Sequence, residues 1–260
     1  MKLAVSTLGM PGEGLDRAIE VAARHGCQGL ELRLHPDTGV HAGLGPGERR
    51  SVRERLAAAG LAAAALAGYA GVCEPGADEP VVERLLADLA LAADLGAPGV
   101  RVFPRGADPA VGARRLKAVS GAARDLGVRV LVETHDAMAT GASVARLLDE
   151  AACPETTGAI WDLLHPWRHG EQPAETLRAL GPWLAYVQVK DAVSAEDCTP
   201  VPMGAGAVPL EESGELLRGS GFDGWVSLEW ERTWYPQVAP VEEILPGAAA
   251  WVERFDGSRR

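Results

Sequence analysis

Short apolar runs alternate with longer stretches of helical periodicity along this chain. The runs expected to form strands span residues 3–6, 29–33, 62–67, 100–103, 128–132, 158–161, 185–189 and 225–228. The stretches between them repeat apolar residues three and four positions apart, which is typical of amphipathic helices. These helices are expected at about residues 15–23, 48–59, 82–93, 109–126, 142–151, 173–180, 211–219 and 241–255. The pattern therefore predicts eight strands, each followed by a helix.

Eight strand-helix units predict an α/β fold, because strands that alternate with helices pair in parallel through crossover connections. We expect one closed (β/α)8 TIM barrel over residues 1–260, a normal length for this architecture. An open, doubly wound sheet is the alternative. Its usual phosphate loop is missing after the first strand: the stretch 9–14 is rich in glycine but has the wrong spacing, and Pro11 removes a backbone donor.

Composition narrows the classes of protein to which the chain can belong. Hydrophobic residues make up 47% of the 260 residues and charged residues 23%, as in globular proteins. The formal net charge of −11 argues against a nucleic-acid partner, because phosphate binding needs a basic surface. No apolar run is long enough for a membrane span or a signal peptide, and the four cysteines are far apart. We expect a cytoplasmic protein that binds neither nucleic acid nor membrane.

Four of the later apolar runs end on polar side chains. These are Glu133 and His135, Asp162 and His165, Gln188 and Lys190, and Glu229 and Glu231. In a barrel, active sites lie at the carboxyl ends of the strands, and alternate residues of a strand face the same side. The sequence therefore predicts that these side chains meet in one pocket. Of the last pair we favour Glu229, because it directly follows its apolar run.

Carboxylates that converge in a buried pocket repel one another, and burial raises their pKa values. A divalent cation relieves both effects. Three carboxylates and an amide oxygen form a hard donor set, which suits Mg²⁺ or Mn²⁺ better than a structural zinc ion. The alternative is an ordinary ion pair, in which Glu133 binds Arg101 or Arg105. In the same way Glu31 and Arg33 could form a pair at the barrel rim, and Lys190 and Asp191 a pair at the surface.

Five segments, in this order along the chain, resemble one known family. They are VRVLVETHD, WDLLHPWRHGE, AYVQVKD, MGAGAVPL and GWVSLEWE. Together they resemble the sugar phosphate isomerase/epimerase family, whose members have a xylose-isomerase-like TIM barrel. The resemblance implies that Glu133, Asp162 and Glu229 are metal ligands. Gln188 stands where the family usually has a histidine ligand. It also implies a divalent metal, Mn or Mg first, with Zn or Co as further options.

The resemblance further implies proton transfer next to a carbonyl group, through an enediolate that the metal stabilises. Glu133 and Glu229 would act as the catalytic base and acid. His135, His165, Lys190 and Arg232 are our candidates for substrate binding. The expected substrate is a small sugar or polyol, and relatives are often homodimers or tetramers. The resemblance does not identify the substrate.

Three other functions are compatible with the same barrel. A lyase could remove water from a polyol or a cyclic polyhydroxy acid. A non-catalytic binding protein could have lost the metal, for which Gln188 is the main argument. A DNA-repair endonuclease is disfavoured, because such sites hold several zinc ions and more histidines, and because the net charge is −11.

Overall fold

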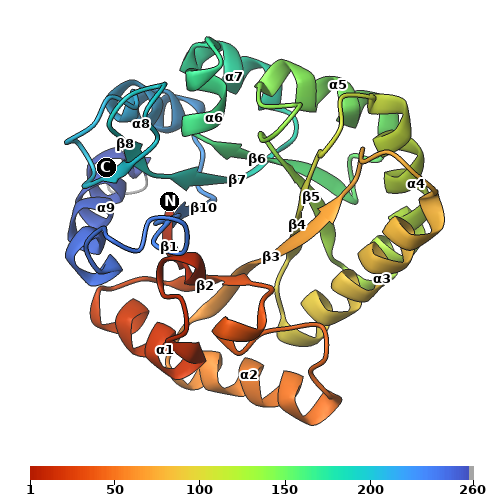
Figure 1. Cartoon of the computed structure of the whole chain (residues 1–260), viewed down its shortest axis with the longest axis horizontal. Coiled ribbons are helices and arrows are strands. Elements are labelled where there is room, and N and C mark those ends of the chain that lie inside the picture. Colours follow the sequence, from red (N-terminus) through yellow and green to blue (C-terminus); the bar gives the residue numbers. More distant parts are fainter. Residues whose placement is uncertain (258–260) are drawn as a thin grey trace.

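The computed structural model describes residues 1–257 and contains a closed barrel of eight parallel strands (Figure 1). The strands are β1 (Lys2–Ser6), β2 (Gly29–Arg33), β3 (Ala62–Gly71), β4 (Gly99–Phe103), β5 (Arg129–Glu133), β6 (Thr157–Asp162), β7 (Leu184–Val189) and β10 (Trp225–Leu228). Strand β1 pairs with both β2 and β10, which closes the sheet. The predicted barrel is confirmed, and the open sheet is excluded. The predicted domain runs to residue 260, and its last three residues lie outside the described part.

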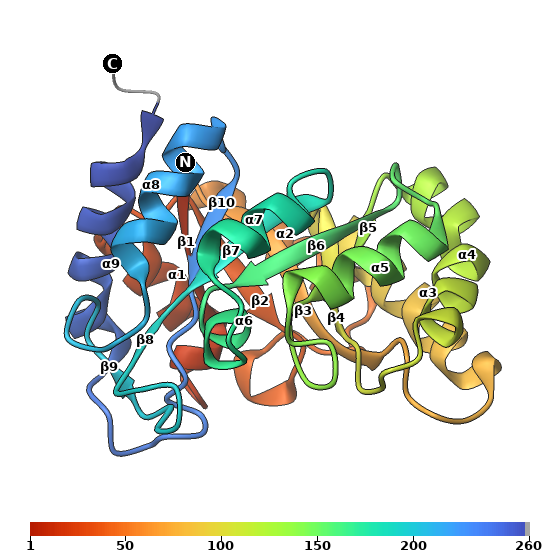
Figure 2. The same ribbon diagram turned by 90° about the horizontal axis from the view of Figure 1, so that it is seen from above.

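An outer ring of helices surrounds the strands (Figures 1 and 2). The helices are α1 (Gly14–Arg24), α2 (Pro46–Ala58), α3 (Asp78–Leu95), α4 (Pro109–Leu126), α5 (Gly141–Ala151), α6 (Leu164–Arg168), α7 (Pro173–Leu180), α8 (Leu210–Ser220) and α9 (Val241–Phe255). The sequence pattern did not predict α6, because five residues are too few to show a helical period. Helix α6 begins where the N–H of Leu164 donates to Oδ1 of Asp162, at 2.8 Å. The end of β6 thus starts the helix that carries His165.

The barrel interior changes from apolar to polar along the strands. Ala65, Leu131, Ile160 and Tyr186 form a small apolar cluster separate from the larger core. Two positions beyond Leu131, Ile160 and Tyr186, at the same face of their strands, are Glu133, Asp162 and Gln188. The barrel therefore has an apolar floor, and its polar layer lies towards the carboxyl ends of the strands.

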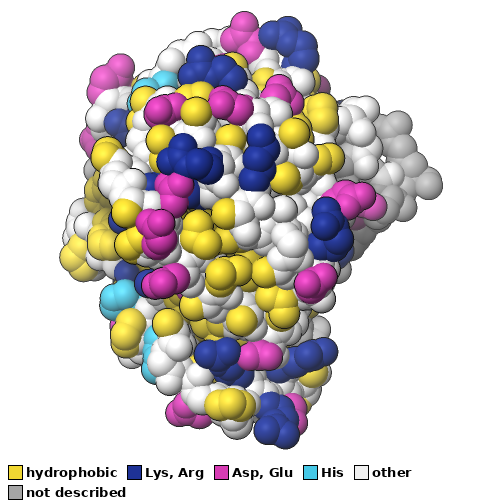
Figure 3. Space-filling model, turned by 90° about the vertical axis from the view of Figure 1, so that its right-hand side faces the viewer, with side chains coloured by type: hydrophobic (Ala, Val, Ile, Leu, Met, Phe, Trp, Pro, Cys, Tyr) yellow, Lys and Arg dark blue, Asp and Glu magenta, His cyan; other side chains and the backbone are white. Residues whose placement is uncertain are grey.

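The outer face over α3 and α4 carries acidic and basic side chains side by side (Figure 3). Asp78 at the start of α3 forms ion pairs with Arg114 and Arg115 of α4. Positive and negative charges are thus interspersed on this face. Among the described helices, none is both long and apolar enough to cross a membrane.

The segment after β7 forms a short antiparallel pair, β8 (Asp191–Ala192) and β9 (Pro200–Val201). Asp191 is buried and accepts hydrogen bonds from the backbone N–H groups of Gly204, Gly206 and Val208, at 2.8, 3.0 and 3.2 Å. The expected surface pair of Lys190 and Asp191 is therefore wrong. Asp191 instead fixes the glycine-rich loop, because its carboxylate accepts hydrogen bonds from three backbone N–H groups of the loop.

We expect Gly206→Ala to destabilise this loop. An alanine Cβ would lie 2.2 Å from the carbonyl oxygen of Ala192 and 2.3 Å from Oδ1 of Asp191. Such overpacking typically costs about 1–3 kcal/mol, which urea denaturation measures. Gly219→Ala in α8 is the matched control, since its Cβ meets nothing within 4 Å. It should stabilise the helix by about 0.5–1 kcal/mol. If Gly206→Ala and the unmodified protein had the same free energy of unfolding, the loop would not be held as rigidly as we infer.

Candidate active site

The carboxyl ends of the strands surround a cavity of about 60 Å³. Its lining comprises Leu8, Tyr69, Arg101, Phe103, Glu133, His135, Lys190, Glu229, Glu231 and Trp234. The lining residues come from the barrel strands and from the loops that follow them. The position agrees with the rule that barrel active sites lie at this end.

Three carboxylates converge at this cavity, and two of them, Glu133 and Glu229, line it. Glu133 is the last residue of β5, Asp162 the last of β6, and Glu229 directly follows β10. Each is at most 4% exposed, and one oxygen of each lies within 4.8 Å of the others. Register explains the convergence, because each side chain lies at an inward position of its strand. The structure thus brings together the three acids that we expected to ligate a metal.

Two buried cations lie among these carboxylates. Nη1 of Arg101 is 3.1 Å from Oε2 of Glu133 and 3.5 Å from Oε1 of Glu229. Nζ of Lys190 is 2.8 Å from Oδ2 of Asp162 and 2.6 Å from Oε2 of Glu229. Each acid thus has a positive partner, and Glu229 has two. The expected alternative, an ion pair between Glu133 and Arg101, therefore exists within the cluster.

Gln188 occupies the fourth corner of the cluster, on β7. Its amide Nε2 donates to Oε1 of Glu31 at 3.2 Å and to Oε1 of Glu229 at 3.0 Å. Among the described residues, no donor reaches its Oε1, although this oxygen is buried. A buried acceptor without a partner costs about 1–3 kcal/mol. Oε1 of Gln188 is therefore a buried oxygen atom that is available to bind a partner.

Burial and charge shift the pKa values of the acids in different directions. Burial raises the pKa of Glu133 well above its ordinary value, despite Arg101. Burial also raises the pKa of Asp162, to about 7, against the opposing effect of Lys190. For Glu229 burial acts in the same direction, but Lys190 and Arg101 outweigh it and lower the pKa. Glu133 and Asp162 therefore hold a proton more readily than Glu229 does.

The residues of the cluster fit a divalent cation. Five carboxylates, those of Glu31, Glu133, Asp162, Glu229 and Glu231, surround two cations, Arg101 and Lys190, which leaves an excess of negative charge when all are ionised. A divalent ion would reduce this excess. The donors are carboxylate and amide oxygens, a set that suits Mg²⁺ or Mn²⁺. Glu133, Asp162, Glu229 and the free oxygen of Gln188 would hold the ion.

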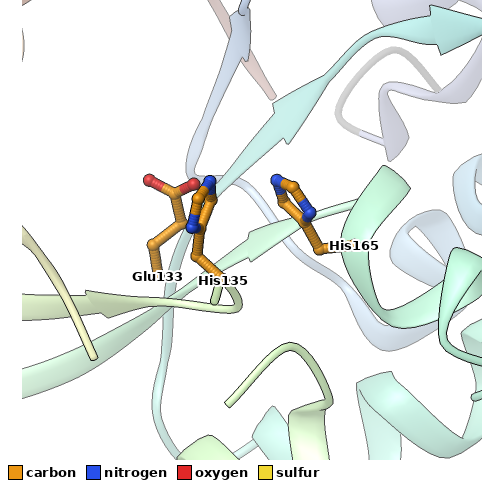
Figure 4. A group of neighbouring side chains, drawn as sticks. All are labelled: Glu133, His135 and His165. Carbon is orange, nitrogen blue, oxygen red and sulfur yellow. The ribbon is translucent and has the colours of Figure 1, made fainter. Parts of the chain in front are cut away.

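A second set of metal-ligating atoms overlaps the first. Figure 4 shows His135 between Glu133 and His165, and one ligand atom of each lies within 4.8 Å of the others. Burial lowers the pKa values of both histidines, so both rings are neutral near pH 7. The two sets share Glu133. The oxygen set is the more buried, and of the two imidazoles His135 lines the cavity.

A row of rings continues from these histidines along the mouth of the site. The ring centroids of Tyr69 and Phe103 are 5.9 Å apart, those of Phe103 and His135 4.6 Å, and those of His135 and His165 4.3 Å. Trp234 also lines the cavity and is 58% exposed. Such rings offer flat apolar surfaces beside polar atoms, as ligand sites commonly do.

Sequence reasoning assigned no role in the site to Glu31, and considered Arg101 only as an ion-pair partner. Both lie between hydrophobic residues of buried strands, as Leu30-Glu31-Leu32 and Val100-Arg101-Val102, and a charge in such a run was the available signal. The expected rim pair of Glu31 with Arg33 is wrong. The two side chains share one face of β2 but have different partners: Arg33 contacts Asp37 and Tyr69, whereas Glu31 contacts Gln188.

The two remaining candidates lie at the edge of the site. Glu231 accepts a hydrogen bond from Lys190 at 2.5 Å and lines the cavity. Arg232 points to Glu13, at 3.2 Å, and is not among the described residues that line the cavity. Substrate contacts of Arg232 and Lys190 therefore stay predictions, and Lys190 is already held by three carboxylates.

Comparisons with known proteins agree with this fold. The model of the family described as xylose isomerase-like TIM barrel matches residues 19–255. A search of curated proteins by sequence finds no significant match.

Solved structures of similar fold carry several descriptions. One is the probable 3-DHS dehydratase AsbF involved in petrobactin synthesis from Bacillus anthracis, at 21% identity, full coverage of both chains and a TM-score of 0.78. Another is the IOLI protein with a zinc atom, at 17% identity, covering 100% of this chain and 99% of that one, with a TM-score of 0.79. A third is D-psicose 3-epimerase with D-fructose, at 16% identity, with coverage of 99% and 100% and a TM-score of 0.78. At these identities the likeness establishes the fold.

Proposed function

The chain belongs to the xylose isomerase-like TIM barrel family, and on that premise we propose that it is a metal-dependent isomerase or epimerase of a sugar or polyol. The observation that carries the proposal is the pair of buried carboxylates, Glu133 and Glu229. They lie on β5 and directly after β10, strands separated in the barrel by β6 and β7. They therefore approach a bound molecule from different sides.

Epimerisation next to a carbonyl needs groups of this kind on both faces of the reacting carbon, whereas aldose–ketose isomerisation can use one group. One carboxylate removes the proton, and the other returns it to the opposite face when the product is an epimer. A bound divalent cation would polarise the substrate carbonyl and adjacent hydroxyl. Lys190 holds Glu229 in place, and Arg101 contacts both glutamates, at 3.1 and 3.5 Å. His135 and His165 would bind substrate hydroxyl groups.

The lining supports a substrate without a phosphate group. Arg101 and Lys190 are the cations that line the cavity among the described residues, and both are already paired with carboxylates. A phosphate would lack a free basic partner there. The row of rings from Tyr69 to His165 would face the C–H groups of a sugar. The similar structure of D-psicose 3-epimerase, which was solved with D-fructose, supports an unphosphorylated sugar as the substrate class.

Deuterium incorporation from solvent tests this proposal. A panel of unphosphorylated ketoses and polyols is incubated in D2O with Mn²⁺, and exchange at carbon is followed by NMR. We expect exchange into at least one ketose, and its loss when the metal is removed by a chelator. Loss of water with formation of an unsaturated product would instead favour the second candidate, a dehydratase, as the likeness to the probable dehydratase suggests. Neither reaction with any member of the panel would contradict both.

A further inference from the structure

Glu31 is a buried carboxylate that the proposed reaction does not use. It lies on β2, is 0% exposed and does not line the cavity. Burying a carboxylate is costly unless it has hydrogen-bond partners. The amide of Gln188 is one of its side-chain partners, with Nε2 3.2 Å from Oε1 and 3.4 Å from Oε2 of Glu31, and the hydroxyl of Ser227 is another. Glu31 therefore contacts the neighbouring polar side chains of β7 and β10.

The amide of Gln188 has only one favourable orientation in this environment. Its two N–H groups point to Glu31 and Glu229, which as carboxylates only accept hydrogen bonds. The reverse orientation would bring the amide oxygen against two negative groups. The observed orientation leaves Oε1 buried without a donor among the described residues. The two glutamates together thus bind the nitrogen of the amide and leave its oxygen free.

We propose that Glu31 is a positioning residue, which orients the amide of Gln188 so that its oxygen serves as the fourth ligand of the divalent cation. The inference rests on the cation site of the proposed function. It explains how Gln188 can serve as the fourth metal ligand although its side chain is an amide. An amide offers a ligand atom on one side only, so its use depends on a partner that fixes the other side. Partners that orient ligands in this way typically change metal affinity by about 10- to 100-fold.

Direct Mn²⁺ binding to the substrate-free protein tests the inference. Glu31→Gln keeps the shape of the side chain but presents both donor and acceptor, so it no longer selects one orientation of Gln188. We expect Mn²⁺ affinity, measured by calorimetry and by the EPR signal of free Mn²⁺, to fall about 10- to 100-fold. The matched control is Glu243→Gln at an exposed position of α9, which should bind Mn²⁺ as the unmodified protein does.

The double variant separates orientation from charge. If Glu31 acts through Gln188, then Glu31→Gln should change Mn²⁺ affinity little once Gln188→Ala has removed the amide. An equal loss in both backgrounds would overturn the inference, because Glu31 would then act through its charge alone. Unchanged affinity in the single variant would overturn it as well. Should Glu31→Gln not fold, Glu31→Asp keeps an acceptor-only group and is expected to lose less than tenfold, whereas a larger loss would contradict the orientation effect.

A spectroscopic readout distinguishes positioning from general stability. In ¹⁵N-labelled protein the side-chain amide signal of Gln188 is identified by its loss in Gln188→Ala. We expect Mg²⁺ to shift this signal in the unmodified protein and to shift it less in Glu31→Gln. If the unmodified protein binds neither Mn²⁺ nor Mg²⁺, the cation site of the proposed function fails. If it binds them and Glu31→Gln changes nothing, only the positioning role fails.

Discussion

Glu229→Gln is expected to abolish exchange of solvent protons into the substrate. Glutamine keeps the size of the side chain but cannot accept a proton from carbon. General acid–base groups contribute about 10²- to 10⁴-fold to rate, and we expect kcat to fall by that amount or more. The loss should exceed that of a simple base, because Glu229 also contacts Lys190, Arg101 and Gln188. The measurement is deuterium incorporation by NMR with the best substrate of the panel.

The control for this variant is Glu243→Gln, which removes an exposed carboxylate and should leave exchange unchanged. Metal content must be measured in both proteins, since Glu229 is also a proposed ligand. Glu229→Gln protein that retains Mn²⁺ and still exchanges at the normal rate would remove Glu229 from the mechanism. Exchange that is lost while Mn²⁺ binding persists would assign the proton transfer to the carboxylate itself.

Lys190→Met is expected to give the largest loss of stability at the site. Lys190 is 3% exposed and contacts Asp162, Glu229 and Glu231 at 2.8, 2.6 and 2.5 Å. Methionine fits the space of the aliphatic stem but leaves three acids without their cation. Removing one partner of a buried ion pair costs about 3–5 kcal/mol. Urea denaturation with a chelator present measures the loss of unfolding free energy.

A divalent cation should compensate part of this loss. Mn²⁺ at 100 times its dissociation constant stabilises a folded protein by about 2.7 kcal/mol. In Lys190→Met the cation is the remaining source of positive charge near Asp162, so added Mn²⁺ should raise the unfolding free energy. Lys117→Met on the exposed face of α4 is the control and should change stability by about 0.5 kcal/mol or less. A Lys190→Met protein as stable as this control would contradict the role of Lys190.

The polar layer of the barrel is balanced by its own side chains as well as by any bound ion. Arg101 and Lys190 each contact more than one carboxylate, which lets the four acids stay buried. This arrangement explains why an uncharged glutamine can lie among the acids at position 188. Gln188 adds no charge, and its amide nitrogen donates to two of the acids while its oxygen stays buried without a donor among the described residues.

The sequence by itself determined the barrel and the strand ends that carry the acids. Strands and helices have different local periods, and both periods are legible along the chain. Strand β2 and strand β10 were predicted with the bounds that the structure has, as was helix α4. The inward position of Glu229 could also be predicted, because it directly follows its apolar run. These features depend on neighbours within a few residues.

Tertiary structure alone decided which charges pair. The partners Glu31 and Gln188 are 157 residues apart, and Arg101 and Glu229 are 128 residues apart. Arg232, a candidate for substrate contact, pairs with Glu13, 219 residues away. Such choices follow from strand register, loop path and the cost of leaving a buried charge alone, none of which has a local pattern. The sequence could therefore name Glu133, Asp162 and Glu229 as acids of the site, and only the folded barrel could add Glu31 and decide among the possible partners.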